Sequence, residues 1–147
     1  MKQILGVIVL LISLSSCQFN SQFINRVADK TQAEQITNKF YTLVKEKNFE
    51  GTVQLFSNKF LEVTPKDKLL QFLVSLEEKL GDFKSANVKS WETFCIEGSH
   101  PSSKYTLAYK TKYEKFDAEE TISLKKDTDG VIRIYGYHVS SDGFLSN

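Results

Sequence analysis

Two titratable side chains near the C-terminus have the types and spacing best suited to acid–base chemistry. Glu120 and His138 fall in consecutive stretches whose residues alternate as in β-strands. One face of the last stretch carries Ile132, Ile134, Gly136 and His138, and the other carries Val131, Tyr135, Tyr137 and Val139. If the first set points inward, Glu120 and His138 can pair, and a Glu–His pair in a half-dry pocket can act as acid and base. Otherwise Glu120 lies at a strand end in water and His138 lies at the rim.

A row of tyrosines is the second candidate site. Tyr105, Tyr109 and Tyr113 share one face of a predicted strand, because successive side chains of a strand point to opposite sides. They can fill the space between a sheet and a helix as core residues. Alternatively, they line a pocket for a small apolar or aromatic ligand.

The remaining cysteine and histidine residues give no catalytic or metal-binding pattern. Cys95 is expected to be a small buried hydrophobe rather than half of a disulfide. His100 lies in a Gly-Ser-His-Pro segment and is expected to be solvated. Without a Cys/His cluster, a phosphate-binding loop or a dinucleotide motif, we expect no metal and no cofactor.

The N-terminus has the pattern of an export signal. Lys2 supplies a positive charge, and residues 4–14 are apolar except for Gly6 and Ser13. This apolar run is shorter than the roughly 20 residues that a helix needs to span a bilayer. The pattern therefore predicts a cleaved signal peptide rather than an anchor helix.

Residues 14–17, with the sequence Leu-Ser-Ser-Cys, resemble the lipobox of bacterial lipoproteins. The resemblance implies a signal peptide of residues 1–16 and acyl chains, palmitate among them, on Cys17. Gln18 is not the Asp that retains some lipoproteins at the inner membrane. The implied location is the cell envelope, on the outer membrane facing the periplasm if the cell has one. The alternative is an ordinary secretory signal with Cys17 merely near the cleavage point.

Composition indicates one globular domain after the signal. Hydrophobic residues make up 41% of the chain and aromatic residues 12%, which is typical of folded proteins. The chain has 19 Lys and Arg against 18 Asp and Glu, and loss of Lys2 makes these counts equal. Such a domain lacks the basic footprint of a nucleic-acid-binding protein. The lipid, rather than a basic patch, is therefore expected to hold it to the membrane.

The first segment of the mature chain is expected to be a tether followed by a helix. Residues 17–30 would form the lipidated N-terminus and tether, part of which can extend the helix or dock on the domain. Thr31 and Glu34 have the spacing of a capping box, and apolar residues follow at helical spacing. A helix is therefore predicted over residues 31–47.

Two further helices are expected before the sheet. Asn48 can cap a short helix that ends at Ser57. Pro65 and Gly81 enclose a leucine stripe, and their positions suit the start and end of a helix. The strongest helix prediction covers residues 65–80.

After Gly81 the pattern changes to alternation. Strands are predicted over residues 88–96, 105–113, 117–125 and 131–139. Asp129 and Gly130 can form the turn between the last two. The tail, residues 141–147, is expected to be loose.

Helices followed by antiparallel strands predict an α+β domain, with the N-terminal helices packed on one face of a curved antiparallel sheet. This order resembles the NTF2-like, or cystatin-like, fold. Residues 119–138, in which an acidic–Gly turn precedes a strand ending in Gly-Tyr, are similar to the C-terminal hairpin of small NTF2-like proteins of unknown function. The resemblance covers residues 31–140. It implies a cone whose mouth can hold a ligand, and homodimers through the sheet in many members.

Two functions are compatible with these observations. The preferred one is a non-enzymatic, membrane-anchored lipoprotein that binds an envelope protein or a small apolar ligand. The alternative is a small envelope enzyme that uses Glu120 and His138. The shape of the cone discriminates between them, because a cone filled by side chains leaves no room for a substrate.

Overall fold

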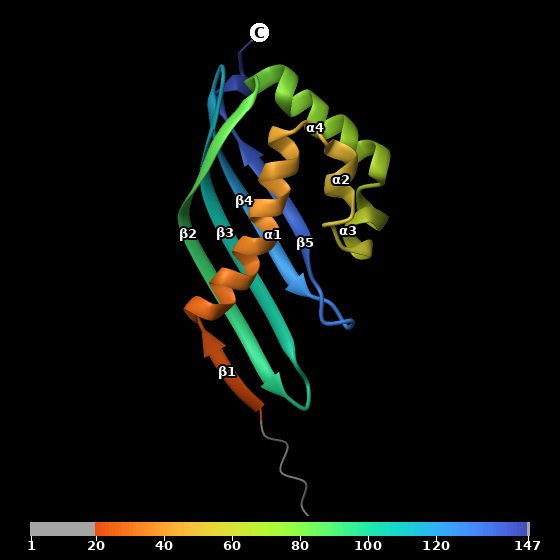
Figure 1. Cartoon of the computed structure of the whole chain (residues 1–147), viewed down its shortest axis with the longest axis vertical. Coiled ribbons are helices and arrows are strands. Elements are labelled where there is room, and N and C mark those ends of the chain that lie inside the picture. The colour runs from red at the N-terminus through yellow and green to blue at the C-terminus, as the bar shows by residue number, and fades with distance from the viewer. Residues whose placement is uncertain (1–19, 147) are drawn as a thin grey trace, which may run out of the picture.

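The computed structural model describes residues 20–146 and shows an α+β domain (Figure 1). The helices are α1 (Val27–Lys45), α2 (Phe49–Val53), α3 (Asn58–Val63) and α4 (Lys66–Leu80). The strands are β1 (Asn20–Ile24), β2 (Phe83–Gly98), β3 (Ser102–Tyr113), β4 (Asp117–Lys126) and β5 (Ile132–Ser140). They form one antiparallel sheet in the order β1-β2-β3-β4-β5. The predicted fold class is confirmed, and the curved, open sheet is consistent with an NTF2-like cone.

The N-terminal segment is more ordered than the expected tether. Asn20–Ile24 forms an edge strand that pairs with β2, from Asn20 opposite Gly98 to Ile24 opposite Phe94. Residues 20–24 therefore belong to the sheet. Cys17 and the predicted signal peptide lie outside the described residues.

Helix α1 begins before the predicted capping box. It starts at Val27, and Thr31 lies inside it, where its hydroxyl donates to the Val27 carbonyl at 3.0 Å. The prediction of Thr31 as N-cap is wrong. The Arg26 guanidinium instead donates to the Asp29 carboxylate at 2.8 and 3.0 Å. Since an acid in the first turn also suits the helix dipole, this charge pair sets where the helix begins.

The short polar residues further along act as caps. Asn48 Oδ1 accepts from the Gly51 N–H at 2.9 Å, as predicted for the start of α2. Ser57 was expected to end a helix, but its hydroxyl accepts from the Phe60 N–H at 3.2 Å and begins α3, which the pattern missed. Helix α4 ends at Leu80, as predicted, and Gly81 follows it with a positive φ of 85°.

The last residues pack against the domain instead of forming a loose tail. Asp142–Phe144 is a 3-10 turn, and the Ser141 hydroxyl donates to the Asp117 carbonyl at 2.6 Å. Gly143 is buried so closely against Leu80 that a Cβ atom there would lie 2.6 Å from Leu80 Cδ2. This contact closes the end of the domain beside α4.

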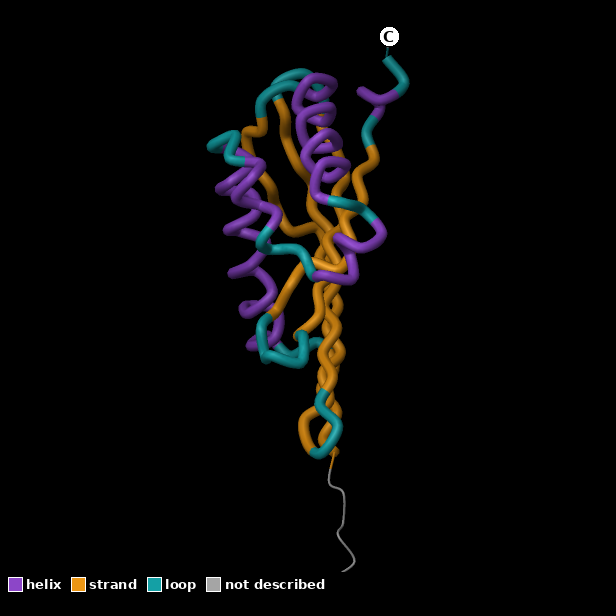
Figure 2. The backbone as a smooth tube through the Cα atoms, turned by 90° about the vertical axis from the view of Figure 1, so that its right-hand side faces the viewer, coloured by secondary structure: helices purple, strands orange, loops and turns teal. Residues whose placement is uncertain are grey.

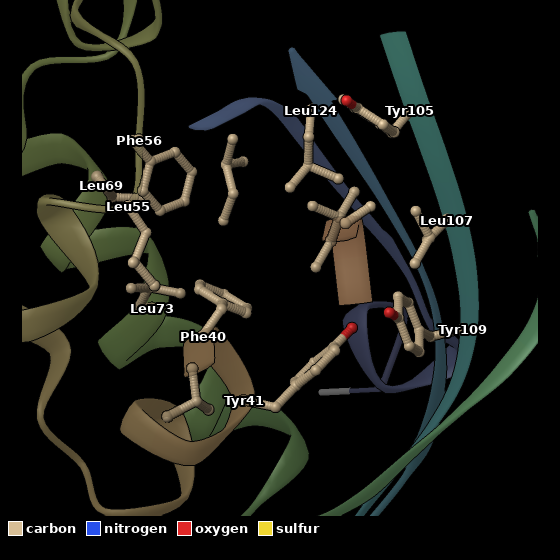
Figure 3. Packing of buried hydrophobic residues seen from close by; sticks show 14 of the residues in the cluster. Phe40, Tyr41, Leu55, Phe56, Leu69, Leu73, Tyr105, Leu107, Tyr109 and Leu124 are labelled. Carbon is tan, nitrogen blue, oxygen red and sulfur yellow. The ribbon is translucent and has the colours of Figure 1, made fainter. Parts of the chain in front are cut away.

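The core fills the space between the helices and the concave side of the sheet (Figure 3). Its labelled members are Phe40, Tyr41, Leu55, Phe56, Leu69, Leu73, Tyr105, Leu107, Tyr109 and Leu124. The view along the sheet in Figure 2 shows helices covering part of it, while the strands run on to one narrow end. No helix within residues 20–146 has the length and apolar character needed to cross a membrane.

Candidate functional site

A carboxylate lies buried among tyrosine hydroxyls in the middle of the fold. Glu120 on β4 has 0% of its surface exposed. Its Oε1 accepts a hydrogen bond from the Tyr113 hydroxyl at 2.6 Å. Its Oε2 accepts from the Tyr137 hydroxyl at 2.7 Å and from the Tyr41 hydroxyl at 3.1 Å. The cluster therefore joins α1, β3, β4 and β5 through one side chain.

Aromatic packing fixes the tyrosines of this cluster. The Tyr41 ring stacks on Phe83, with centroids 5.2 Å apart and planes at 9°. The Tyr137 ring meets Phe40 edge to face at 5.1 Å. With their rings held in this way, the hydroxyls are oriented before any ligand is present. Sequence reasoning missed Tyr41 and Tyr137 as partners of Glu120. The available signal was a tyrosine beside Phe40 on the apolar face of α1.

The predicted row of tyrosines faces the interior. Tyr105, Tyr109 and Tyr113 are 1%, 2% and 7% exposed. Tyr109 lies directly opposite Glu120 in the strand register, yet its hydroxyl is 2.6 Å from Thr37 Oγ1 and not on the carboxylate. Only Tyr113 of the row hydrogen-bonds to Glu120. The three tyrosines belong to the buried hydrophobic clusters of the domain.

The structure does not bring Glu120 and His138 together. His138 pairs with Thr121 and is exposed on the outer face of the sheet. The reason is an irregularity in β5, where Ser123 pairs with Gly136 but Leu124 pairs with Ile134. This leaves one additional residue in β5, so the inward face changes along the strand. Both predicted assignments of an inward face to β5 are therefore wrong for part of the strand. Ile134 points inward before the irregularity, and Tyr137 points inward after it.

Burial controls the electrostatics of the cluster. It raises the pKa of Glu120 above its ordinary value, while the tyrosine hydrogen bonds act in the opposite direction. Burial and the nearby Glu120 charge also raise the pKa of Tyr41, Tyr113 and Tyr137. The tyrosines therefore remain protonated donors, and Glu120 is the member that titrates first as the pH rises.

Residues 20–146 leave little space near these groups. A void of about 10 Å³ lies near the cluster, and its lining includes Val44, Phe83 and Tyr113. That volume is at the lower limit for one water molecule. The carboxyl oxygens of Glu120 already accept three internal hydrogen bonds, and these bonds orient the three tyrosine hydroxyls. It acts as a satisfied polar network in the core.

The larger hollows of the described chain are on the surface. One of about 480 Å³ is lined by residues that include Lys110, Lys112, Asp117 and Glu119. It lies at the end of the sheet where β3 turns into β4, and it carries charges of both signs. An open, polar hollow of this kind suits a segment of another protein better than a small apolar molecule.

Of the other two candidate residues, Cys95 is buried and His100 is exposed. Cys95 is a free thiol, 2% exposed, as predicted for a small buried side chain, and burial raises its pKa. His100 is exposed in the turn between β2 and β3. Within residues 20–146, no three His, Cys, Asp or Glu side chains are grouped so that they could hold a metal ion.

No protein-family model matches the chain, and no curated protein matches its sequence.

Proposed function

We propose that this chain is a lipoprotein of the bacterial cell envelope whose NTF2-like domain binds another envelope protein and is not an enzyme. The observation that carries the proposal is the filled cone. The void among the core residues beside Tyr113 has a volume of only about 10 Å³. The buried carboxylate of Glu120 is sealed by the hydroxyls of Tyr41, Tyr113 and Tyr137. The surface of the domain would then bind the partner protein.

The sequence supports the anchoring part of the proposal. Leu-Ser-Ser-Cys at residues 14–17 follows a short apolar run with one positive charge. A single acyl chain gives only marginal membrane binding, whereas two or more hold a protein firmly. Acylated Cys17 would thus keep the domain at the membrane without a spanning helix.

The mixed-charge hollow is the surface that we assign to the partner. It lies between β2, β3, β4 and the residues after β5, and its volume is about 480 Å³. Lys112 lies opposite Asp117 in the strand register, so both signs of charge are presented side by side. This pattern favours a polar protein segment with charges of both signs, because electrostatic complementarity selects partners and orients them.

The anchor is tested in cells with a palmitate analogue and the variant Cys17→Ser. We expect the wild-type protein to carry the label and sediment with membranes, and the variant to lose both properties. An unlabelled wild-type protein would contradict the lipoprotein assignment.

The binding role is tested with a photo-crosslinker placed at Lys112 in the hollow or, as the control, at exposed Lys39 on α1. We expect one partner to crosslink at Lys112 and not at Lys39, and the crosslink to disappear when Asp117→Lys reverses a charge in the hollow. Turnover of a small molecule by the purified domain, abolished by Glu120→Gln, would contradict the non-enzymatic role.

A further inference from the structure

The distance between the proposed lipid anchor and the folded domain is very short, and the inference below rests on that anchor. Strand β1 begins at Asn20, with only Gln18 and Phe19 between it and Cys17. Three Cα–Cα steps of about 3.8 Å span at most about 11 Å in any conformation. The headgroup layer of one leaflet is itself about 5–8 Å deep. Asn20 must therefore lie within a few ångströms of the headgroups.

Strand β1, whose first residue is Asn20, starts at the narrow end of the sheet (Figure 1, Figure 2). Asn20 pairs with Gly98, and its side chain accepts from the His100 N–H at 3.5 Å, next to the turn between β2 and β3. Strand β2 has 16 residues and reaches from this end toward the other. At about 3.3 Å per residue that is about 50 Å, so the mixed-charge hollow is far from the anchor.

One row of side chains crosses the outer face of the sheet at this end. Its members are paired in register from strand to strand and are Ile24, Phe94, Lys104, Lys125 and Arg133. We call them the anchor-side row. Paired residues of antiparallel strands project to the same side, and the neighbours Thr93 and Cys95 are buried on the helix side. The row therefore faces away from the helices.

The apolar half of the row is on the edge of the sheet that carries the anchor, with Ile24 at the far end of β1 from Asn20. Ile24 is 67% exposed, and Phe94, which lies opposite it, is half-buried. An isolated exposed isoleucine needs no explanation. Here, however, it lies on the edge strand that continues directly from the proposed lipidated residue.

The basic half of the row has an unfavourable arrangement. Lys104 and Lys125 are directly opposite each other, and like charges in this position repel. Neither makes an ion pair within residues 20–146. Arg133, the next member, is neutralised by Asp127 and Asp129 at 2.9 and 2.8 Å. The half-buried Lys125 places its ammonium group 4.6 Å from the centroid of the Tyr135 ring, but this contact leaves its charge without a carboxylate. Two adjacent ammonium groups of this kind favour an anionic partner outside the chain.

The geometry points to the headgroup layer of the anchoring membrane as that partner. We infer that the anchor-side row lies on this layer, with Lys104 and Lys125 against lipid phosphates and Ile24 and Phe94 at the acyl boundary. Lysines reach phosphates while their stems and neighbouring apolar groups remain in less polar surroundings. The helices, on the opposite side of the sheet, then project away from the membrane. The mixed-charge hollow, on the same face as the row, lies at the end of the sheet that is far from the anchor.

The test uses the full, acylated protein in vesicles of phosphatidylcholine and phosphatidylglycerol that carry a headgroup quencher. A fluorophore is attached to Gln22→Cys on the outer face near the anchor, to Asn87→Cys on the outer face far from it, or to Gln32→Cys on α1. All three positions are exposed, and buried Cys95 remains unlabelled. We expect severalfold stronger quenching at position 22 than at the other two.

Charge reversal provides a matched control. Lys104→Glu with Lys125→Glu should lower the quenching at position 22, whereas Lys110→Glu with Lys112→Glu, on the same face but far from the anchor, should leave it unchanged. Equal quenching of all three labels on acylated protein would overturn this inference and leave the lipoprotein assignment intact. Protection of position 22 that appears only at high protein density would also overturn it, because that result indicates a second copy. Absence of acyl chains on Cys17, measured by the intact mass, would overturn both.

Discussion

Removal of one tyrosine hydroxyl from the Glu120 cluster should destabilise the domain, because it leaves a buried carboxyl oxygen without one of its hydrogen-bond donors. The Tyr137 hydroxyl donates to Glu120 Oε2 at 2.7 Å, and phenylalanine keeps the ring while deleting this donor. Removing the donor of a buried hydrogen bond costs about 1–3 kcal/mol, because the acceptor left behind is not rehydrated. We expect Tyr137→Phe to lower the free energy of unfolding by about 2 kcal/mol near neutral pH. Tyr41→Phe should cost less, because its oxygen–oxygen distance is 3.1 Å.

Urea unfolding followed by the emission of Trp91, the single tryptophan, measures this change. Tyr135→Phe is the matched control, since Tyr135 lies on the other side of β5 and is 38% exposed. It should change the free energy of unfolding by less than about 0.5 kcal/mol, as is usual for surface positions. A double-mutant cycle with Glu120→Gln should show a coupling energy of about 1–2 kcal/mol for Tyr137. Equal effects of Tyr137→Phe and Tyr135→Phe would refute the reasoning.

Three further predictions follow from burial and close contact. Because the folded-state pKa of Glu120 is raised above 4.5, the folded protein binds this proton more tightly than the unfolded chain does. The stability of the wild type relative to Glu120→Gln should therefore be greatest below pH 4.5 and fall by at most about 1.4 kcal/mol per pH unit up to the folded-state pKa. Parallel urea titrations at several pH values measure this, and a constant difference would contradict it. Gly143→Ala should cost about 1–3 kcal/mol in thermal unfolding through overpacking against Leu80, and an unchanged melting temperature would show that the C-terminal turn is not packed as described. The Cys95 thiol, buried and with a raised pKa, should react with a thiol reagent only after unfolding, so fast labelling under native conditions would contradict its burial.

Elements bounded by local chemistry were predictable from the sequence. Helix α4 lies between Pro65 and Gly81 with a leucine stripe between them, and its observed bounds are Lys66–Leu80. The start of α1 depends only partly on local chemistry. Arg26 pairs with Asp29, three residues on, but its guanidinium also donates to Glu97 at 2.6 Å, and these two residues are far apart in the sequence. Strand β1 was not predicted either. Its short, mostly polar sequence forms a strand by pairing with β2, which is far away in the sequence.

The candidate site shows where alternation stops being informative. Alternation identified β5 as a strand, but a face can be assigned by parity only while each residue of one strand opposes one residue of the next. The irregularity opposite Ser123 and Leu124 breaks this condition and turns Tyr137, rather than His138, toward Glu120. A histidine there would have paired the carboxylate with a second titratable group near neutral pH. A tyrosine instead supplies a donor that stays protonated, and it closes the interior with an aromatic ring. One additional residue in β5 thus separates a possible acid–base centre from a sealed core, and it is why we place the function of this domain on its surface.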